Sequence, residues 1–156
     1  MTTDNILTFL QARISETDAT MRGARDANPG PWKPVLDNYV DDRVADWTEA
    51  EIFDGNEERV VAYNGSEAAI KLRTLKFIGE HHPIRVIREI HAKRDLIVHA
   101  LDTASALDNE AGCGHTALQI RNGECPKTNV NDLRILRILA MVDGDHVDYD
   151  ENWSTY

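Results

Sequence analysis

The residues best suited to chemistry lie in one short stretch, CGHTALQIRNGEC, which spans residues 113–125 and holds both cysteines of the chain. Cys113 and His115 are separated by a single glycine, and Cys125 follows ten residues later. Thiolates and imidazoles are preferred ligands of Zn²⁺, and a structural zinc site uses four of them in a tetrahedron. We predict a zinc site with Cys113, His115 and Cys125 as ligands, and with His99, near the end of the preceding helix, as the fourth.

The same stretch leaves three other interpretations open. The cysteines could be free thiols that pack as small apolar side chains, or a disulfide that closes a loop of about 12 residues under oxidising conditions. A bound zinc could also be catalytic, with Glu110 or Glu124 as the general base of a metal-dependent hydrolase. The HxE…PCxxC pattern of zinc deaminases is absent. We therefore favour a structural zinc ion.

A basic segment and two tryptophans are the remaining candidates for binding. Arg85, Arg88 and Lys93 lie in HHPIRVIREIHAKR and could share a helix face that binds an anion or an acidic partner, although a solvated face is the commoner outcome. Trp32 and Trp153 could cover the edge of the core or anchor a protein partner. No phosphate-binding glycine loop, nucleophile elbow or HExxH motif is present, so the sequence assigns no catalytic residue.

Composition limits the class of protein. The chain has 156 residues, a length typical of a single domain, and 42% of them are hydrophobic. Its net charge is −10, which argues against nucleic acid as a partner because nucleic-acid affinity depends on Lys and Arg. It has no apolar run long enough to cross a membrane and no signal peptide, and its two cysteines fit a reducing compartment. We expect a cytoplasmic protein that does not enter membranes.

The periodicity of apolar residues predicts the elements that position these side chains. We expect an α+β fold that is mainly helical, with about four helices, one β-hairpin and a loop closed by zinc. The predicted single domain comprises a first helix (1–28), a β-hairpin (32–64), two central helices (67–107), the Cys/His loop (108–128), a last helix (129–142) and a solvated acidic tail (143–156).

Several strings occur in an order that resembles a known family. GPW follows the first helix, RVIREIHAKR lies in the second central helix, and Cys125–Pro126 precedes LRILA and the final DHVDYDENW. Together they resemble a family of small proteins of unknown function from actinobacteria and their phages (domain of unknown function 6221). Members of that family often carry a cysteine pair spaced like a metal knuckle and then Cys-Pro, which here correspond to Cys113, His115 and Cys125. The resemblance implies a phage or prophage accessory protein and supplies no activity.

These observations favour a non-enzymatic protein that binds a host protein and carries a structural zinc site. The acidic surface is expected to select a basic partner surface. The metal-dependent hydrolase is the alternative, and an acidic mimic of DNA that occupies a nucleic-acid-binding protein is a third. The oligomeric state is not predicted by any feature of the sequence.

Overall fold

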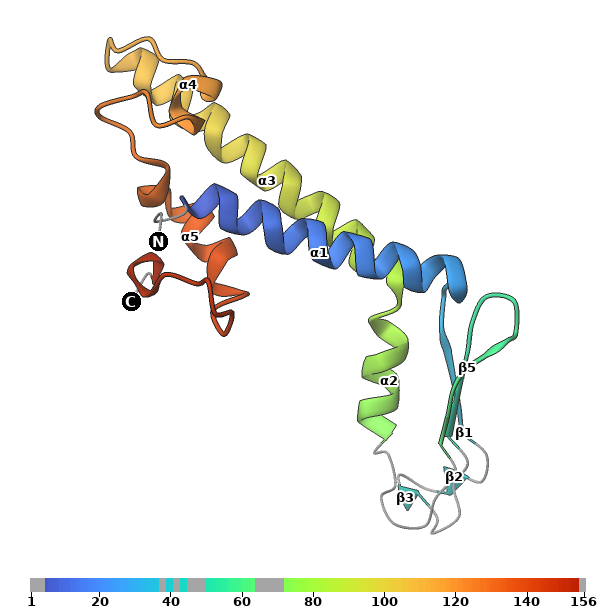
Figure 1. Cartoon of the computed structure of the whole chain (residues 1–156). Helices are drawn as coiled ribbons and strands as arrows, with labels where there is room; N and C mark the ends of the chain where they lie inside the picture. The colour runs from blue at the N-terminus through green and yellow to red at the C-terminus, as the bar shows by residue number, and fades with distance from the viewer. Residues whose placement is uncertain (1–4, 37–38, 41–42, 45–49, 64–71, 155–156) are drawn as a thin grey trace. The chain divides into compact units, whose positions relative to one another are not determined.

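The computed structural model describes residues 5–36, 39–40, 43–44, 50–63 and 72–154 (Figure 1). The chain forms two compact units, one from residues 1–17 and 90–156 and the other from residues 18–89, and each is described by itself. The elements, in chain order, are α1 (Ile6–Ala27), β1 (Lys33–Leu36), β2 (Tyr39–Val40), β3 (Arg43–Val44), β4 (Ala50–Phe53), β5 (Arg59–Tyr63), α2 (Leu72–Glu80), α3 (Pro83–Glu110), α4 (Ala117–Arg121), η1 (Val130–Asp132), α5 (Arg134–Met141) and η2 (Glu151–Trp153).

The predicted fold class is confirmed in its coarse form, because the described chain is mainly helical with a small antiparallel sheet. The expected single hairpin is wrong in detail. β4 and β5 form a hairpin, but β1 adds a third strand in the order β1-β4-β5, and β2 pairs with β3 in a separate ribbon. β1 contains Pro34, which an edge strand tolerates because its free side needs no donor.

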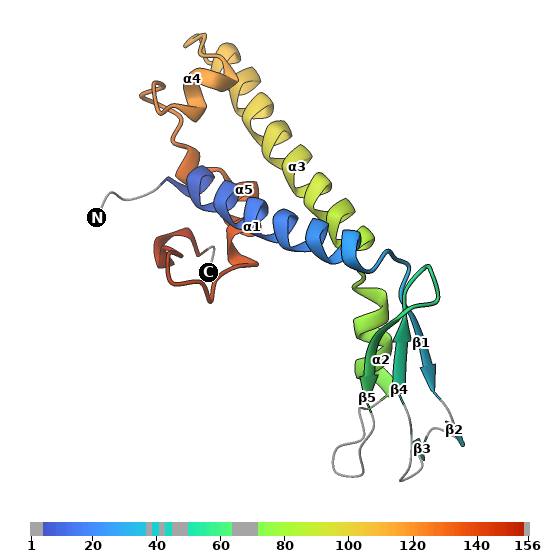
Figure 2. The same cartoon turned by 45° about the vertical axis from the view of Figure 1, so that its right-hand side comes forward.

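The sheet belongs to the unit of residues 18–89. β1 pairs with β4 through Lys33↔Phe53, and β4 pairs with β5 through Ala50↔Tyr63. The β4–β5 turn is built by Asp54, whose Oδ1 accepts hydrogen bonds from the backbone N–H groups of Asn56 at 2.8 Å and Glu58 at 2.9 Å. Figure 2 shows the three strands side by side with α2 beside them, in agreement with the contacts of α2 with β1 and β4.

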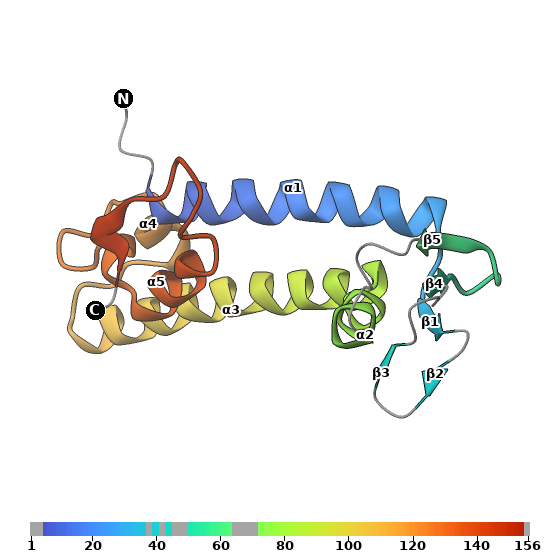
Figure 3. The same cartoon turned by 90° about the horizontal axis from the view of Figure 1, so that it is seen from below.

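The unit of residues 1–17 and 90–156 has a core built by amphipathic helices. α1 contributes Ile6, Phe9, Leu10 and Ile14, and each is at most 6% exposed. This three-to-four-residue spacing places apolar side chains on one stripe of a helix. Figure 3 shows α4, α5 and the C-terminal segment gathered around the first turns of α1 and the last turns of α3. The remaining buried apolar residues of this core are Leu7, Ile90, Ile97, Ala100, Leu101, Ala104, Ile120, Cys125, Val130, Leu136, Leu139, Ala140 and Trp153.

The described part of the C-terminal segment packs onto α1 and does not form the solvated tail that we predicted. The Trp153 ring is 3% exposed and lies 5.2 Å from the Phe9 ring, centroid to centroid. Tyr149 lies 5.9 Å from Phe9 and 5.7 Å from Trp153. Burial of these aromatic rings stabilises the packing of the segment on α1, and its carboxylates stay at the surface.

None of the helices in the described part of the chain combines the length and apolar character that a membrane crossing requires.

Candidate metal centre

The centre begins with Asp108, in the last turn of α3. Asp108 continues the buried stripe of Ile97, Leu101 and Ala104, and its side chain is only 1% exposed. A buried carboxylate needs hydrogen-bond donors or a cation nearby, because an isolated charge is strongly destabilised by loss of water. The residues after the helix supply donors.

A glycine-flanked turn returns the chain to Asp108. The Cys113 backbone N–H donates to the Asp108 backbone carbonyl at 3.0 Å, which closes the end of α3. Gly112 and Gly114 on either side have φ angles of +78° and +79°. Residues with a side chain rarely adopt such left-handed angles, and glycine adopts them freely. The two glycines therefore bring Cys113 and His115 back to the same carboxylate.

His115 is held on two sides. Asp108 Oδ2 accepts a hydrogen bond from the His115 backbone N–H at 2.8 Å and lies 2.9 Å from His115 Nδ1. The Ser105 hydroxyl donates to the His115 backbone carbonyl at 2.8 Å. The next residue, Thr116, forms a capping box with Gln119 that starts α4. The backbone of His115 is thus held between the end of α3 and the beginning of α4, and its imidazole contacts Asp108.

Cys125 completes the cluster from the other side of α4. It is 6% exposed, and its Sγ donates to Asp108 Oδ1 at 3.0 Å and accepts from the Thr128 backbone N–H at 3.3 Å. Gly123, with φ of +74°, turns the chain after α4 so that Cys125 faces Asp108. Each oxygen of Asp108 therefore has partners within the cluster.

The electrostatics favour negative charge on this cluster. The hydrogen bond from the Cys125 thiol, the backbone N–H of His115 and the His115 side chain lower the pKa of Asp108 to about 2, against the opposing effect of burial. The pKa of Lys127 is raised, chiefly by its hydrogen bond and charge interaction with Cys113 and to a smaller extent by Asp108 and Cys125. An ammonium group thus lies beside Cys113.

The donor set suits a metal ion. Ligand atoms of Asp108, Cys113 and His115 all lie within 4.8 Å of one another, and Cys125 Sγ is 3.0 Å from Asp108. One carboxylate, one imidazole and two thiols are ligands that Zn²⁺ accepts in tetrahedral sites. The structure thus brings together Cys113 and His115, two of the residues that we predicted as ligands, while the third, Cys125, contacts Asp108 and is not in the group of mutually close ligand atoms.

His99 is not part of this group. It is exposed and precedes Asp108 by nine residues on α3, about 13 Å along the axis at 1.5 Å per residue. Asp108 stands where we had placed a histidine. The sequence did contain a signal for Asp108, because it is an acidic residue that falls on the apolar, buried face of α3. Burying a carboxylate without hydrogen-bond partners is energetically unfavourable, so partners are expected at such a position.

None of the other predicted binding residues is in the group of close ligand atoms found among the described residues. Arg85 Nε donates to Glu89 Oε1 at 3.0 Å, while Arg88 is exposed and Lys93 is half-buried. Trp32 is half-buried, donates to the Asn28 carbonyl at 3.1 Å, and shares a shallow hollow with Arg85. Trp153 is a core residue, so its ring is not available as an exposed anchor.

The two proposed bases are both at the surface. Glu110 ends α3 and is exposed, and Glu124 is exposed and accepts a hydrogen bond from the Asn122 amide at 3.1 Å. Neither belongs to the group of close ligand atoms found among the described residues.

Comparison with known proteins gives a family and no function. The chain belongs to a family of unknown function, DUF6221, whose sequence model matches residues 3–155. No curated protein and no solved structure matches it. The resemblance seen in the order of the sequence strings is confirmed for the family itself.

Proposed function

We propose that the chain is a small non-enzymatic protein that binds another protein, and that a structural zinc ion held by Asp108, Cys113, His115 and Cys125 stabilises its fold. The observation that supports the zinc site is that ligand atoms of Asp108, Cys113 and His115 lie within 4.8 Å of one another. Cys125, the proposed fourth ligand, contacts Asp108 at 3.0 Å. Binding of zinc at this place would require Cys113 and Cys125 to lose their protons.

A structural role is supported by where the ligands come from. Asp108 lies in the last turn of α3, Cys113 and His115 lie in the turn that follows the helix, and Cys125 comes after α4. An ion bound to all four would therefore tie the end of α3 to the chain that leads into η1 and α5. Free energy of zinc binding adds directly to folding free energy where the unfolded chain lacks a formed site.

Charge balance also favours this ligand set. Zn²⁺ with one carboxylate, two thiolates and a neutral imidazole has a net charge of −1. The Lys127 ammonium beside Cys113 would offset that charge. Groups around the ligands commonly tune metal sites in this way.

Binding of a protein partner is supported by the surface. Several large apolar residues of α3 and α5 are exposed, and the chain carries a net charge of −10. Exposed apolar residues within a charged surface are typical of protein-binding regions. The phage or prophage setting and the host partner come from the resemblance to the family, and they remain part of the proposal.

The deciding experiment measures zinc per chain and melting temperature in untagged protein, for the parent and for His115→Gln and His99→Gln. We expect about one zinc per chain in the parent and in His99→Gln. We expect His115→Gln to lose the ion and to melt at a lower temperature. Zinc-free parent protein, or loss of zinc in His99→Gln with retention in His115→Gln, would contradict the proposed ligands.

The metal-dependent hydrolase remains the second candidate because Cys113 and His115 are only half-buried, so water can reach them. A catalytic ion would keep water in the fourth position, with Cys125 remaining a thiol bonded to Asp108. X-ray absorption at the zinc edge separates the two: two sulfur ligands support the structural site, and one sulfur with a water oxygen supports the hydrolase.

A further inference from the structure

A pocket of about 250 Å³ lies within the unit of residues 1–17 and 90–156, where α1, α3 and α4 meet. Ile14 of α1 and Ile97 and Leu101 of α3 line it, and each is at most 8% exposed. Val98 of α3 also lines the pocket and is 57% exposed, so the pocket opens to solvent beside this residue. The pocket therefore combines an apolar floor with an open side.

Polar side chains complete the lining. Gln11 and Ser15 come from α1, Arg94 from α3, and Arg121 from the last turn of α4. Gln11, Ser15 and Arg121 are exposed, and Arg94 is half-buried. No acidic residue of the described chain lines the pocket, and Arg121 forms no ion pair within that part of the protein. The rim of the pocket is therefore polar and basic.

The basic rim is a local exception on an acidic unit. The unit contains 13 acidic and 7 basic residues, and two of the seven basic residues line this one pocket. On α3, Asp95 and Asp102 directly follow Arg94 and Leu101, and each step of one residue turns the helix by about 100°. Charges separated by more than about 8 Å of water are largely screened at physiological salt. A ligand seated in the pocket would therefore interact chiefly with the arginines.

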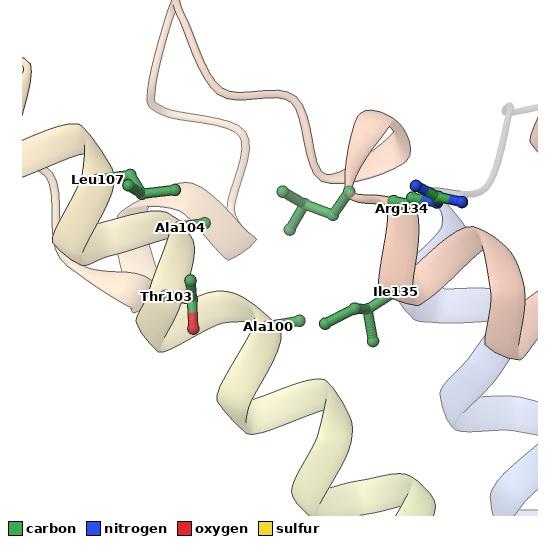
Figure 4. A pocket seen from close by; sticks show the side chains of 7 residues that line it. Ala100, Thr103, Ala104, Leu107, Arg134 and Ile135 are labelled. Carbon is green, nitrogen blue, oxygen red and sulfur yellow. The ribbon is translucent and has the colours of Figure 1, made fainter.

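A second hollow, of about 220 Å³, lies between α3 and the beginning of α5 (Figure 4). Ile135 of α5 points toward Ala100 of α3, and Leu107 of α3 extends into the same space. Arg134 is its only charged lining residue among those that the structure describes. Because this hollow carries one arginine and an otherwise almost wholly apolar lining, it provides a comparison site for the pocket beside α4.

The size of the pocket beside α4 favours a small molecule over a helix of a partner. One turn of α-helix, about 10 Å wide and 5.4 Å long, occupies roughly 400 Å³, which is more than the pocket holds. Arg94 and Leu101 are seven residues apart, or about 10 Å along α3. An extended chain gains about 1.2 Å per bond, so about eight carbons cover that length.

We propose that this pocket binds a small organic anion with an apolar chain, a carboxylate or phosphate head on about eight carbons. The chain would lie on Ile14, Ile97 and Leu101, and the head would pair with Arg121 at the rim. Arginine binds both kinds of head through two parallel hydrogen bonds. Ligand sites are typically apolar with a few polar groups that fix the orientation of the ligand. Such binding needs neither the zinc ion nor a protein partner, so it goes beyond the proposed function.

The test measures binding of octanoate to the full-length protein by isothermal titration calorimetry. Butanoate has the same head and a shorter chain, octylammonium has the same chain with the opposite charge, and octyl phosphate has the other anionic head. The variants are Arg121→Gln, Val98→Asp and, as the matched control at the comparison site, Arg134→Gln. All three positions are exposed, so the variants should keep the melting temperature of the parent to within a few degrees.

We expect octanoate to bind the parent with a dissociation constant of about 1 mM or lower. Each buried CH₂ group tightens binding by about three- to fourfold, so butanoate should bind at least about tenfold more weakly. Arg121→Gln and Val98→Asp should each weaken octanoate binding at least about fivefold, because one removes the charged donor and the other adds a repelling carboxylate. Arg134→Gln should stay within about twofold of the parent, because an exposed charge outside the pocket contributes little.

Binding of octyl phosphate without octanoate would also support the pocket and would assign a phosphate head to its ligand. Absence of binding by both anions would overturn the proposal, and so would octylammonium binding as tightly as octanoate. Equal affinity of Arg121→Gln and the parent would remove the pocket beside α4 as the site. Loss of binding in Arg134→Gln alone would give the ligand to the hollow between α3 and α5.

Discussion

One oxygen of Asp108 contacts His115 twice. Oδ2 accepts the His115 backbone N–H at 2.8 Å and lies 2.9 Å from His115 Nδ1, so a single carboxylate oxygen sets both the path of the chain and the orientation of the ring. The other oxygen, Oδ1, accepts the Cys125 thiol at 3.0 Å. Asp108 is therefore the residue through which the turn after α3 and the chain after α4 are held together.

Replacing Asp108 by Asn should weaken zinc binding. The amide is neutral and offers one acceptor oxygen, so it cannot serve both His115 and Cys125. Loss of a carboxylate that ligates the ion or orients a metal-binding histidine typically lowers affinity by about 10–100-fold. Competition with a chromophoric chelator would measure this loss. Asp102→Asn, an exposed acid on the same helix, is the control and should leave zinc affinity unchanged.

Gly112 allows the backbone of the turn to be tested without changing any ligand. Its φ is +78°, and no atom lies within 4 Å of the place that a Cβ would occupy, so alanine there meets only backbone strain. We expect Gly112→Ala to destabilise the protein by about 1 kcal/mol. Gly23 also has free space where a Cβ would lie but belongs to α1, so Gly23→Ala should stabilise by roughly 0.5–1 kcal/mol.

Urea denaturation of the two alanine variants beside the parent gives both free energies. Opposite signs for the two substitutions would support the left-handed turn. A neutral or stabilising Gly112→Ala would mean that residues 112–115 do not hold this conformation in solution.

The sequence predicted the Cys/His part of the site because thiols and imidazoles are recognisable ligands at short spacing. Asp108 was missed because its role depends on burial, which follows from the packing of α3 and not from the spacing of ligands. The capping pattern of Thr116 and Gln119 predicts α4, but we expected a loop over the whole stretch. The capping pattern alone was enough to predict α4. The role of Asp108 could be predicted only by knowing which face of α3 packs against the core.

For the fold, long helices were predictable because α1 and α3 repeat apolar residues every three or four positions. The acidic C-terminal segment was misjudged because its carboxylates dominate the composition. Its aromatic residues pack against Phe9, which is more than a hundred residues away in the sequence. Contacts of that kind depend on tertiary packing, and no local pattern predicts them. The third strand, β1, was missed for the same reason.

Trp153 tests whether the C-terminal segment is part of the core. Trp153→Ala removes a ring that is 3% exposed and packed against Phe9 and Tyr149, and should destabilise the protein by about 3–5 kcal/mol. Val147 belongs to the same segment and is 90% exposed, so Val147→Ala should change stability by no more than about 0.5 kcal/mol. Equal stability of the two variants, measured by urea denaturation, would place the segment outside the core.

His82 should make stability depend on pH in the unit of residues 18–89. Burial, followed by the charges of Arg88 and Arg85, lowers the pKa of His82 below its usual 6.5. The folded chain therefore binds this proton less readily than the unfolded chain. Stability contributed by neutral His82 is complete above pH 6.5 and is lost as the pH falls from there through the pKa of the folded state.

A variant without a titrating ring isolates the effect of burial and of the two arginines on His82. His82 Nδ1 lies 3.4 Å from the Arg85 backbone N, whose N–H also donates to the His82 carbonyl at 3.0 Å. We expect the parent to lose more stability than His82→Gln between about pH 7.5 and a pH below about 6.5, because glutamine does not titrate. NMR titration of the imidazole gives the pKa directly. A value at or above about 6.5, or equal losses in the two proteins, would mean that the arginines and burial do not act on His82 as the structure indicates.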